Sequence, residues 1–313
     1  MKEILVVTYL NNYQKIFIFY YILKYGRYEM ASNILIAIKN LVENPITALT
    51  AHYSGRNRVN GVGNALEVYI KDLFANTLLY EDEYSRLNVY NEVFSYTGNQ
   101  NNPPDIILKN GDAIEVKKVQ GNASVLALNS SYPKNKLYSD STMITNVCRA
   151  CEKWDVKDII YIVGNTSDTH LKELWVVYGD CYAADKSIYE RIKNTIVDGL
   201  HSISCIELAE TNELGKIKRV DPFGITDLRV RGMWSIFHPK KVFDYLPKQN
   251  KSSDFKFYCV MKTEKFDQFP EEDKKSLLAL KDNENFFIHD IQIRNPNNPV
   301  QLIPVKFMEF YYE

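Results

Sequence analysis

The chain has 313 residues, with 38 Lys and Arg against 39 Asp and Glu, so its formal net charge is −1. Hydrophobic residues make up 45% and charged residues 25%, which excludes a wholly disordered chain, a collagen-like chain and a disulfide scaffold. The length suits one large domain or two smaller domains, and either can bury a core. The nearly neutral charge also argues, at first sight, against a nucleic-acid partner.

The N-terminal residues 1–29 are rich in Tyr and Phe, and we expect neither a membrane-spanning helix nor a signal peptide in them. The apolar run Ile16–Leu23 has about eight residues, whereas a helix needs about 20 to cross a bilayer. Met30 opens a cleaner start, because Ser32 or Asn33 can cap a helix with apolar residues at helical spacing. We therefore expect Met30 to be the physiological start and residues 1–29 to be a non-native upstream extension.

Downstream of Met30, helical and strand patterns follow one another. Helices are predicted where apolar residues recur every three or four positions, and strands where they alternate or run continuously between turn signals. The order predicts a single α/β domain over residues 30–313, with a mixed central sheet flanked by helices and peripheral additions. The predicted helices are about 32–43, 62–79, 142–154, 187–199 and 276–281, the strands about 89–95, 105–108, 113–119, 159–163, 174–178, 286–293 and 300–310, and the loops 52–60 and 295–299.

Five cysteines are scattered along the chain. An odd, scattered set fits a reducing compartment, so we expect a cytoplasmic protein. Cys148 and Cys151 form a single C-x-x-C pair, which is a weak zinc signal without a second pair. We favour the interpretation that both are small apolar residues on a predicted helix.

The most informative stretch is a predicted hairpin around Asn110-Gly111, with Asp105 on its first strand and Glu115 and Lys117 on its second. A two-residue loop would place Asp105 opposite Val116 and turn Glu115 and Lys117 to the other face. An odd loop, such as residues 110–112, places Asp105 opposite Lys117 with Glu115 two residues along the same face. Gly111 can supply the positive φ that such a loop needs. We therefore predict an odd loop or a bulge, with the three side chains converging.

Two converging carboxylates repel each other unless a cation lies between them, and hard oxygen ligands suit Mg²⁺. A lysine beside them can hold the attacking water or help to deprotonate it, while the metal lowers the pKa of that water and stabilises charge on a phosphate. Asp105, Glu115 and Lys117 are thus candidate catalytic residues for phosphodiester hydrolysis. The alternative is a surface hairpin with solvated charges, which the hairpin spacing and its apolar neighbours disfavour.

Pro104-Asp105 followed by Glu115-Val116-Lys117 resembles the signature of the PD-(D/E)XK nuclease superfamily. The resemblance implies a restriction-endonuclease-like α/β core, metal ligation by Asp105, Glu115 and the Val116 carbonyl, and positioning of water by Lys117. Many members carry a further glutamate on the preceding helix, which makes Glu67 a candidate third metal ligand. The alternative for Glu67 is an exposed helix glutamate.

Longer blocks resemble the NgoPII-type restriction endonucleases over nearly the whole chain from about Met30. The resemblance implies a type II enzyme that cleaves double-stranded DNA with Mg²⁺ at a short palindrome, GGCC in that family, and leaves 5′-phosphate ends. It also implies a cytosine methyltransferase encoded nearby, which protects host DNA without being a physical partner. A palindrome implies a homodimer with one active site per strand. The matching blocks are residues 102–105, 111–118, 127–131, 157–164, 228–234 and 295–299.

The near-zero net charge hides a basic segment, residues 213–251, with nine basic and four acidic residues. Its charge of +5 leaves −6 for the remaining residues. This asymmetry indicates a DNA-binding region. Arg229 and Arg231 alternate on a predicted strand and could read two adjacent guanines. The alternative for both is a structural salt bridge, for instance with Asp221 and Asp227.

Other predicted DNA contacts follow the catalytic strand. Lysines there are interpreted as phosphate contacts, and small polar residues of the same loop are expected to touch DNA as well. The catalytic core is expected at about 60–200. The residues are Lys118, Lys134 and Lys136 for phosphates, with Asn129, Ser130 and Ser131 beside them.

Two rival functions stay open. One is a structure-selective DNA repair or recombination nuclease with the same fold. The other is a DNA-binding protein whose metal site is inactive, against which the intact set of two acids and a lysine argues.

Overall fold

A computed structural model describes residues 32–53, 62–99, 102–121, 124–167, 170–204, 206–209, 211, 213–249 and 251–313. The expected upstream extension, residues 1–29, lies outside the described residues. Residues 54–60 of the predicted loop 52–60 lie outside them as well. Among the described residues, no helix is both long and apolar enough to span a bilayer.

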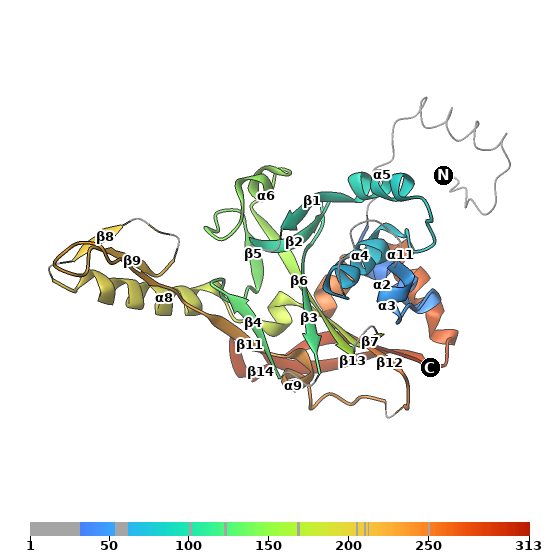
Figure 1. Ribbon diagram of the computed structural model, residues 1–313. Helices are drawn as coiled ribbons and strands as arrows, with labels where there is room; N and C mark the ends of the chain where they lie inside the picture. The colour runs from blue at the N-terminus through green and yellow to red at the C-terminus, as the bar shows by residue number, and fades with distance from the viewer. Residues whose placement is uncertain are drawn as a thin grey trace. The chain divides into compact units, whose positions relative to one another are not determined.

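A mixed sheet forms the centre of the described part of the chain (Figure 1). β3 runs parallel to β6, and β7 runs parallel to β12, while the other neighbouring strands are antiparallel. The predicted mixed sheet is thus confirmed. Its strands, in spatial order, are β1 (Phe94–Asn99), β2 (Asn102–Leu108), β3 (Ala113–Gln120), β6 (Val156–Ser167), β7 (His170–Tyr178), β12 (Phe255–Lys262), β14 (Asn298–Tyr312) and β13 (Phe286–Asn295), with β5 (Lys136–Tyr138) paired to β6.

Helices lie against this sheet, and two small sheets are added to it. Four helices group together beside β3, β6 and β7 in Figure 1: α2 (Ile34–Glu43), α3 (Leu49–Tyr53), α4 (Val62–Ala75) and α11 (Glu271–Leu278, followed by a 3-10 turn at Ala279–Asp282). The others are α5 (Glu83–Val93), α6 (Asn146–Ala150), α7 (Gly179–Tyr182), α8 (Lys186–His201), α9 (Pro239–Val242) and α10 (Thr263–Asp267). The small sheets are β4 (Val125–Asn129) with β11 (Trp234–Phe237), and β8 (Glu207–Ala209) with β9 (Gly215–Lys218) and β10 (Leu228–Val230).

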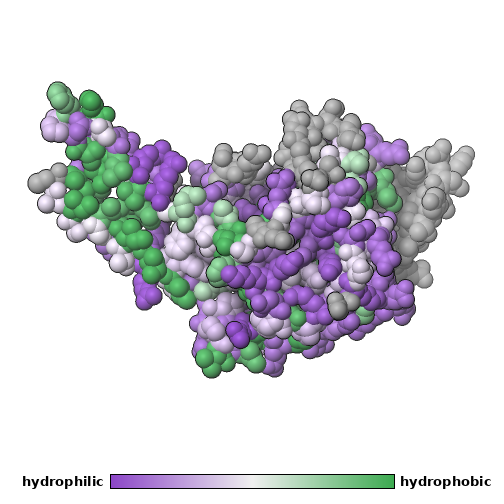
Figure 2. All heavy atoms as spheres, turned by 60° about the horizontal axis from the view of Figure 1, so that its bottom comes forward, coloured by the Kyte–Doolittle hydropathy of each residue, from purple (hydrophilic) through white to green (hydrophobic). Residues whose placement is uncertain are grey.

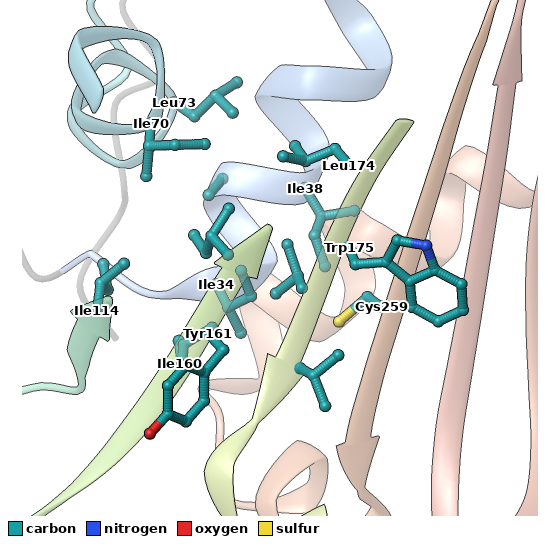
Figure 3. Packing of buried hydrophobic residues seen from close by; sticks show 14 of the residues in the cluster. Ile34, Ile38, Ile70, Leu73, Ile114, Ile160, Tyr161, Leu174, Trp175 and Cys259 are labelled. Atoms are coloured by element: carbon teal, nitrogen blue, oxygen red, sulfur yellow. The ribbon is translucent and has the colours of Figure 1, made fainter. Parts of the chain in front are cut away.

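The core fills the space on both faces of the central strands (Figure 3). Ile38 of α2 and Leu73 of α4 pack toward Leu174 of β7. On the other face of β7, the Trp175 ring stacks on Phe243 with ring centroids 6.1 Å apart. Burial on both faces explains the nearly continuous apolar runs of β6 and β7, which differ from the alternating pattern of a half-exposed sheet.

Most predicted elements are present, and a helix cap and a hairpin turn illustrate why. Asn33 caps α2 by accepting hydrogen bonds from the backbone of Leu35 and Ile36, as its side chain predicted. Asn295 pairs with Asn298, so the predicted turn cluster closes the β13–β14 hairpin.

Two predictions about elements are wrong, and one central strand was missed. Residues 89–93, predicted as part of a strand, form the end of helix α5. Asp82 caps this helix, and its inward side chains recur every three or four positions, as in a helix. These side chains are Arg86, Val89, Tyr90 and Val93. The predicted helix 142–154 is reduced to α6. Strand β12 was not predicted at all, although it is a central strand of the sheet.

A buried carboxylate joins the helices on which the site depends. Asp72 of α4 is fully buried and accepts hydrogen bonds from the hydroxyl groups of Tyr53 (2.8 Å), Thr77 (2.5 Å) and Tyr90 (2.6 Å). The buried Arg86 guanidinium lies 3.9 Å away. These contacts connect α3, α4 and α5.

Replacing Asp72 by alanine is expected to lower the free energy of unfolding by about 3–5 kcal/mol, because buried hydroxyl groups and a buried arginine lose their acceptor. Urea unfolding followed by circular dichroism measures this loss. Asp290→Ala is the matched control, since that carboxylate is 72% exposed and should contribute no more than about 0.5 kcal/mol. Equal losses in the two variants would contradict a bracing role for Asp72.

Candidate active site

The hairpin that carries the predicted site has an odd loop, as predicted. The loop comprises residues 109–111, because the register of β2 and β3 is set by the Ile107–Ala113 pair. The three-residue loop suggested from the sequence, residues 110–112, is wrong by one position. Asp105 therefore faces Glu115 and not Lys117. The parity is unchanged, and all three side chains share one face of the hairpin.

The turn is made by a different residue from the one expected. Asn110 has the positive φ of 55°, not Gly111. Asparagine tolerates this conformation better than most residues, because its short polar side chain can hydrogen-bond locally. Gly111 remains close to Leu108, where a Cβ would lie 3.0 Å from the leucine Cβ.

Asp105 lies where the pairing of β2 with β3 ends. Its Oδ2 accepts a hydrogen bond of 2.6 Å from the backbone N–H of Val116, and so takes the place of the next strand–strand contact. The other edge of β3 continues to pair with β6 as far as Gln120. The carboxylate is therefore held against the strand that carries Glu115 and Lys117.

The pKa of the Asp105 carboxyl is shifted by its surroundings. Burial and, next, the charge of Glu115 raise it to about 7, although the Val116 N–H and the Lys117 ammonium act to lower it. Glu115 is 8% exposed, and its Oε2 has no hydrogen-bond partner among the described residues. A buried carboxylate oxygen without a partner, facing a second carboxylate, fits a divalent cation with oxygen ligands.

Lys117 is the third member of the site. Its Nζ lies 2.7 Å from Glu115 Oε1. Burial lowers the pKa of Lys117, but the charges of Glu115 and Asp105 outweigh burial and raise it. Lys117 is therefore held as a cation beside the two carboxylates.

The loop after β4 supplies the opposite wall of the pocket. Asn129, Ser130, Ser131 and Lys134, which were singled out as candidate DNA contacts, line the same pocket as Asp105, Glu115 and Lys117. Lys134 is buried and donates to Ser131 Oγ, while its backbone N–H donates to the Tyr161 hydroxyl at 2.8 Å. Burial lowers the pKa of Lys134 to about 8.

Glu67 lies on α4, close enough for its charge to raise the pKa of Asp105. Its Oε1 accepts from Lys71 Nζ at 2.7 Å, one helical turn away. In the part of the chain that the structure describes, no three acidic, histidine or cysteine side chains gather as a metal site. The geometry thus brings together two carboxylates and Lys117, while Glu67 acts on Asp105 through its charge and does not line the pocket.

Arg229 lies in β10 and Arg231 just after it, and neither lines this pocket. Both guanidinium groups bind the same carboxylate, Glu213, at distances of 2.7–3.0 Å. The salt bridges of the alternative interpretation are therefore present, but with Glu213 in place of Asp221 and Asp227: Asp227 pairs with Lys216, and Asp221 caps its own loop. More than half of each arginine side chain stays exposed.

The two remaining predicted phosphate contacts, Lys118 and Lys136, do not line the pocket of Asp105 and Glu115. Lys118 is exposed on β3 and does not line the pocket. Lys136 lines a neighbouring pocket and binds Asp158. Part of the +5 charge of residues 213–251 is also balanced by acids elsewhere, since Lys218 and Arg219 contact Glu207 and Lys240 contacts Glu173.

Several residues of the site were not singled out from the sequence, although Asn102, Tyr161 and Trp234 lie in blocks that resemble the family. Tyr132 and Tyr161 line the pocket, and Asn102 fixes its rim by donating to Met143 O at 3.1 Å. Trp234 pairs with Asn129 across the β4–β11 contact and packs edge-on against Tyr132. Only long-range pairing brings these residues together, so spacing along the chain could not reveal them.

A mixed sheet flanked by helices, with two carboxylates and a lysine where a central hairpin opens, defines a nuclease of the restriction-endonuclease-like fold. A model of the NgoPII restriction endonuclease family matches residues 32–294. The type II restriction enzyme NgoPII of Neisseria gonorrhoeae is 47% identical over 280 residues, which cover 89% of this chain and 99% of that enzyme. The chain therefore belongs to the NgoPII family of type II restriction endonucleases, which are site-specific deoxyribonucleases. No solved structure matches it.

Proposed function

We propose that this enzyme cleaves double-stranded DNA at a short palindrome, for which GGCC is the first candidate, with Mg²⁺ held by Asp105, Glu115 and the Val116 carbonyl. The observation that carries the proposal is the buried, unpartnered Oε2 of Glu115 facing Asp105. When bound, Mg²⁺ would make water more acidic and stabilise negative charge on the phosphate. Action in the cytoplasm, where the DNA of the host lies, is part of the proposal.

Lys117 is proposed to position the attacking water. Its ammonium already lies 2.7 Å from Glu115, so a water that replaces this contact can be held between the lysine and the carboxylate. Lys134 and the hydroxyl groups of Ser130 and Ser131 face the same pocket and are proposed to bind the scissile phosphate. Release of the 3′ oxygen would leave 5′-phosphate ends.

Purified protein incubated with plasmid DNA and Mg²⁺ tests this proposal. Type II cleavage gives discrete fragments whose ends fall in one sequence, and a plasmid methylated on its cytosines at that sequence is protected. Nicking that follows DNA structure would favour a repair or recombination nuclease instead. No cleavage would favour an inactive DNA-binding protein.

A homodimer is proposed because a palindrome presents the same bond on both strands. Figure 2 shows apolar side chains gathered along the segment built from α8 and strands β8–β10. Isoleucines on α8 and residues of the loop before β10 are exposed there: Ile188, Ile192, Ile196, Phe223 and Ile225. Exposed apolar surface of this kind is typical of protein interfaces, and a second copy of the chain is the proposed partner.

Arg231 is proposed to read a guanine. Only its Nε is bound to Glu213, and neither terminal nitrogen has a partner among the described residues, so both can donate to guanine O6 and N7. Arg229 uses its Nε and one terminal nitrogen on Glu213, which leaves it one free edge. The β4–β11 pairing connects this segment to the catalytic pocket at Asn129.

Arg231→Ala is expected to lower the preference for the cognate site by about 10- to 100-fold, since a bidentate guanine contact contributes about 1–3 kcal/mol of discrimination. Binding of cognate and altered duplexes, measured with Ca²⁺ to prevent cleavage, gives that ratio. Arg219→Ala is the matched control, because Arg219 is another exposed arginine of this segment, bound to Glu207. Unchanged preference in Arg231→Ala would refute the assignment.

A further inference from the structure

A second hollow, the α8 groove, continues from the active-site pocket along helix α8. Ser130, Tyr132, Lys134 and Met143 line both, so the two spaces are continuous. The Tyr132 hydroxyl donates to Glu190 of α8 at 2.9 Å. The loop after β4, residues 130–135, and helix α8 are therefore the two walls of one groove.

The wall formed by α8 is further held by aromatic contacts. Tyr189 of α8 stacks on Tyr132 with ring centroids 5.4 Å apart, and Trp234 packs edge-on against both rings. These packed rings thus fix this part of α8 against the loop after β4. The groove is a built surface, because its walls are joined by a hydrogen bond and by three ring contacts.

The α8 groove contains more lysines than acids. Four lysines line it, against Asp140 and Glu190, and the acids are partly occupied. Asp140 is largely exposed and lies 3.9 Å from the Lys186 ammonium, and Glu190 accepts from Tyr132. The lysines are Lys134, Lys136, Lys186 and Lys193.

Three of these lysines have partners inside the protein. Lys134 binds Ser131, Lys136 binds Asp158, and Lys186 lies 4.0 Å from the centroid of the Tyr138 ring. Lys193 is half-buried, and among the described residues it has neither an ion pair nor a hydrogen bond. Lys193 is therefore a cation of the groove that no acid among the described residues neutralises.

The neutral residues of the groove also suit an anion. Ser141, Thr142 and Asn194 offer hydroxyl and amide donors along the same wall. Such donors, together with lysines, are the usual contacts to phosphate and sugar in protein–DNA complexes. Because the groove leads into the pocket of Asp105 and Glu115, an anion there would be adjacent to the bond that is cleaved.

We propose that the α8 groove binds the phosphodiester backbone of the cleaved DNA strand next to the scissile phosphate, with Lys193 as its main contact and Lys186 beside it. This inference rests on the proposed function, and it adds the path that the cleaved DNA strand takes over the protein surface. Lys193 contacts a phosphate that is not cleaved, so it contributes to affinity for any sequence and not to chemistry.

Salt-dependent binding tests the groove. With Ca²⁺ in place of Mg²⁺, Lys193→Ala should weaken binding of cognate and unrelated duplexes by the same factor and reduce the slope of log K against log salt by about 0.9. Lys193→Arg should restore the slope. Arg191→Ala is the matched control, because Arg191 is on the same helix but does not line the groove, and its slope should equal that of the wild type.

A neutral methylphosphonate, placed at one phosphate at a time in the cleaved strand, locates the contact. Wild-type binding should weaken at one phosphate beside the scissile one, where Lys193→Ala should show no additional loss. Equal slopes for Lys193→Ala and Arg191→Ala would overturn the groove proposal alone. Salt-dependent binding without cleavage by the wild type would overturn the proposed function, and absence of salt-dependent binding would overturn both.

Discussion

Asp105→Asn is expected to slow DNA cleavage by about 10³-fold, which corresponds to roughly 4 kcal/mol of lost transition-state stabilisation. Asparagine keeps the shape and can still accept the hydrogen bond from the Val116 N–H, so the hairpin should remain intact. The variant loses only the negative charge that faces Glu115. Single-turnover cleavage of a duplex with one cognate site, at saturating enzyme and Mg²⁺, measures the loss.

Glu67→Gln is the informative comparison for this variant. Lys71 binds the Glu67 carboxylate, and Glu67 influences Asp105 only through its charge, so we expect about a tenfold loss or less. A loss as large as that of Asp105→Asn would make Glu67 a full metal ligand. An Asp105→Asn enzyme that cleaves at the wild-type rate would refute the proposed mechanism.

Lys117→Met is expected to slow cleavage by about 10²- to 10³-fold, the usual range for loss of a group that moves or holds a proton in the transition state. Methionine keeps the length of the side chain but removes the ammonium that lies 2.7 Å from Glu115. Binding of DNA should change little, because the lysine acts on the water. The same single-turnover assay, combined with a binding measurement in Ca²⁺, separates these effects.

Lys118→Met is the matched control for Lys117→Met. The next residue of a strand points to the opposite face, and Lys118 is exposed and does not line the pocket. Its replacement should leave the cleavage rate at saturating enzyme unchanged and only weaken binding of DNA. If both lysine variants lost the same amount of activity, Lys117 would have no special role in the chemistry.

The hairpin of the candidate site could be predicted from the sequence because strand alternation is a strictly local rule. An odd loop is enough to place Asp105, Glu115 and Lys117 on one face, whichever three residues form it. The exact register could not be predicted, since it depends on whether Asn110 or Gly111 adopts the left-handed conformation. Both residues tolerate that conformation, so composition alone does not choose between them.

Features that depend on contacts between distant parts of the chain were not predicted from the sequence. Strand β12 was not predicted, although it pairs with β7 on one side and β14 on the other. The opposite error was made for residues 89–93, where two valines and a tyrosine suggested a strand but the Asp82 cap and the packing of α5 decide for a helix. Lys193 had no motif around it, because its position next to the active site follows from the way α8 packs against Tyr132.

The basic segment shows a similar limit. Its local charge was read correctly from the sequence, but charge counting cannot show that Glu207 and Glu173, outside the segment, bind its cations. Arg229 and Arg231 share Glu213, sixteen residues or more from each along the chain, and not the acids closest to them in sequence. The number of free cations is therefore a property of the fold.

Binding of a divalent cation is the measurement that tests the central claim most directly. Titration of Mn²⁺, as a spectroscopic probe for the Mg²⁺ site, into metal-free protein should show binding by the wild type. Affinity should fall at least about tenfold in Asp105→Asn and in Glu115→Gln, since each removes a charged ligand. It should not fall in Lys117→Met, where Glu115 is released from its ion pair. Equal affinity in the wild type and both carboxylate variants would contradict a metal site at Asp105 and Glu115.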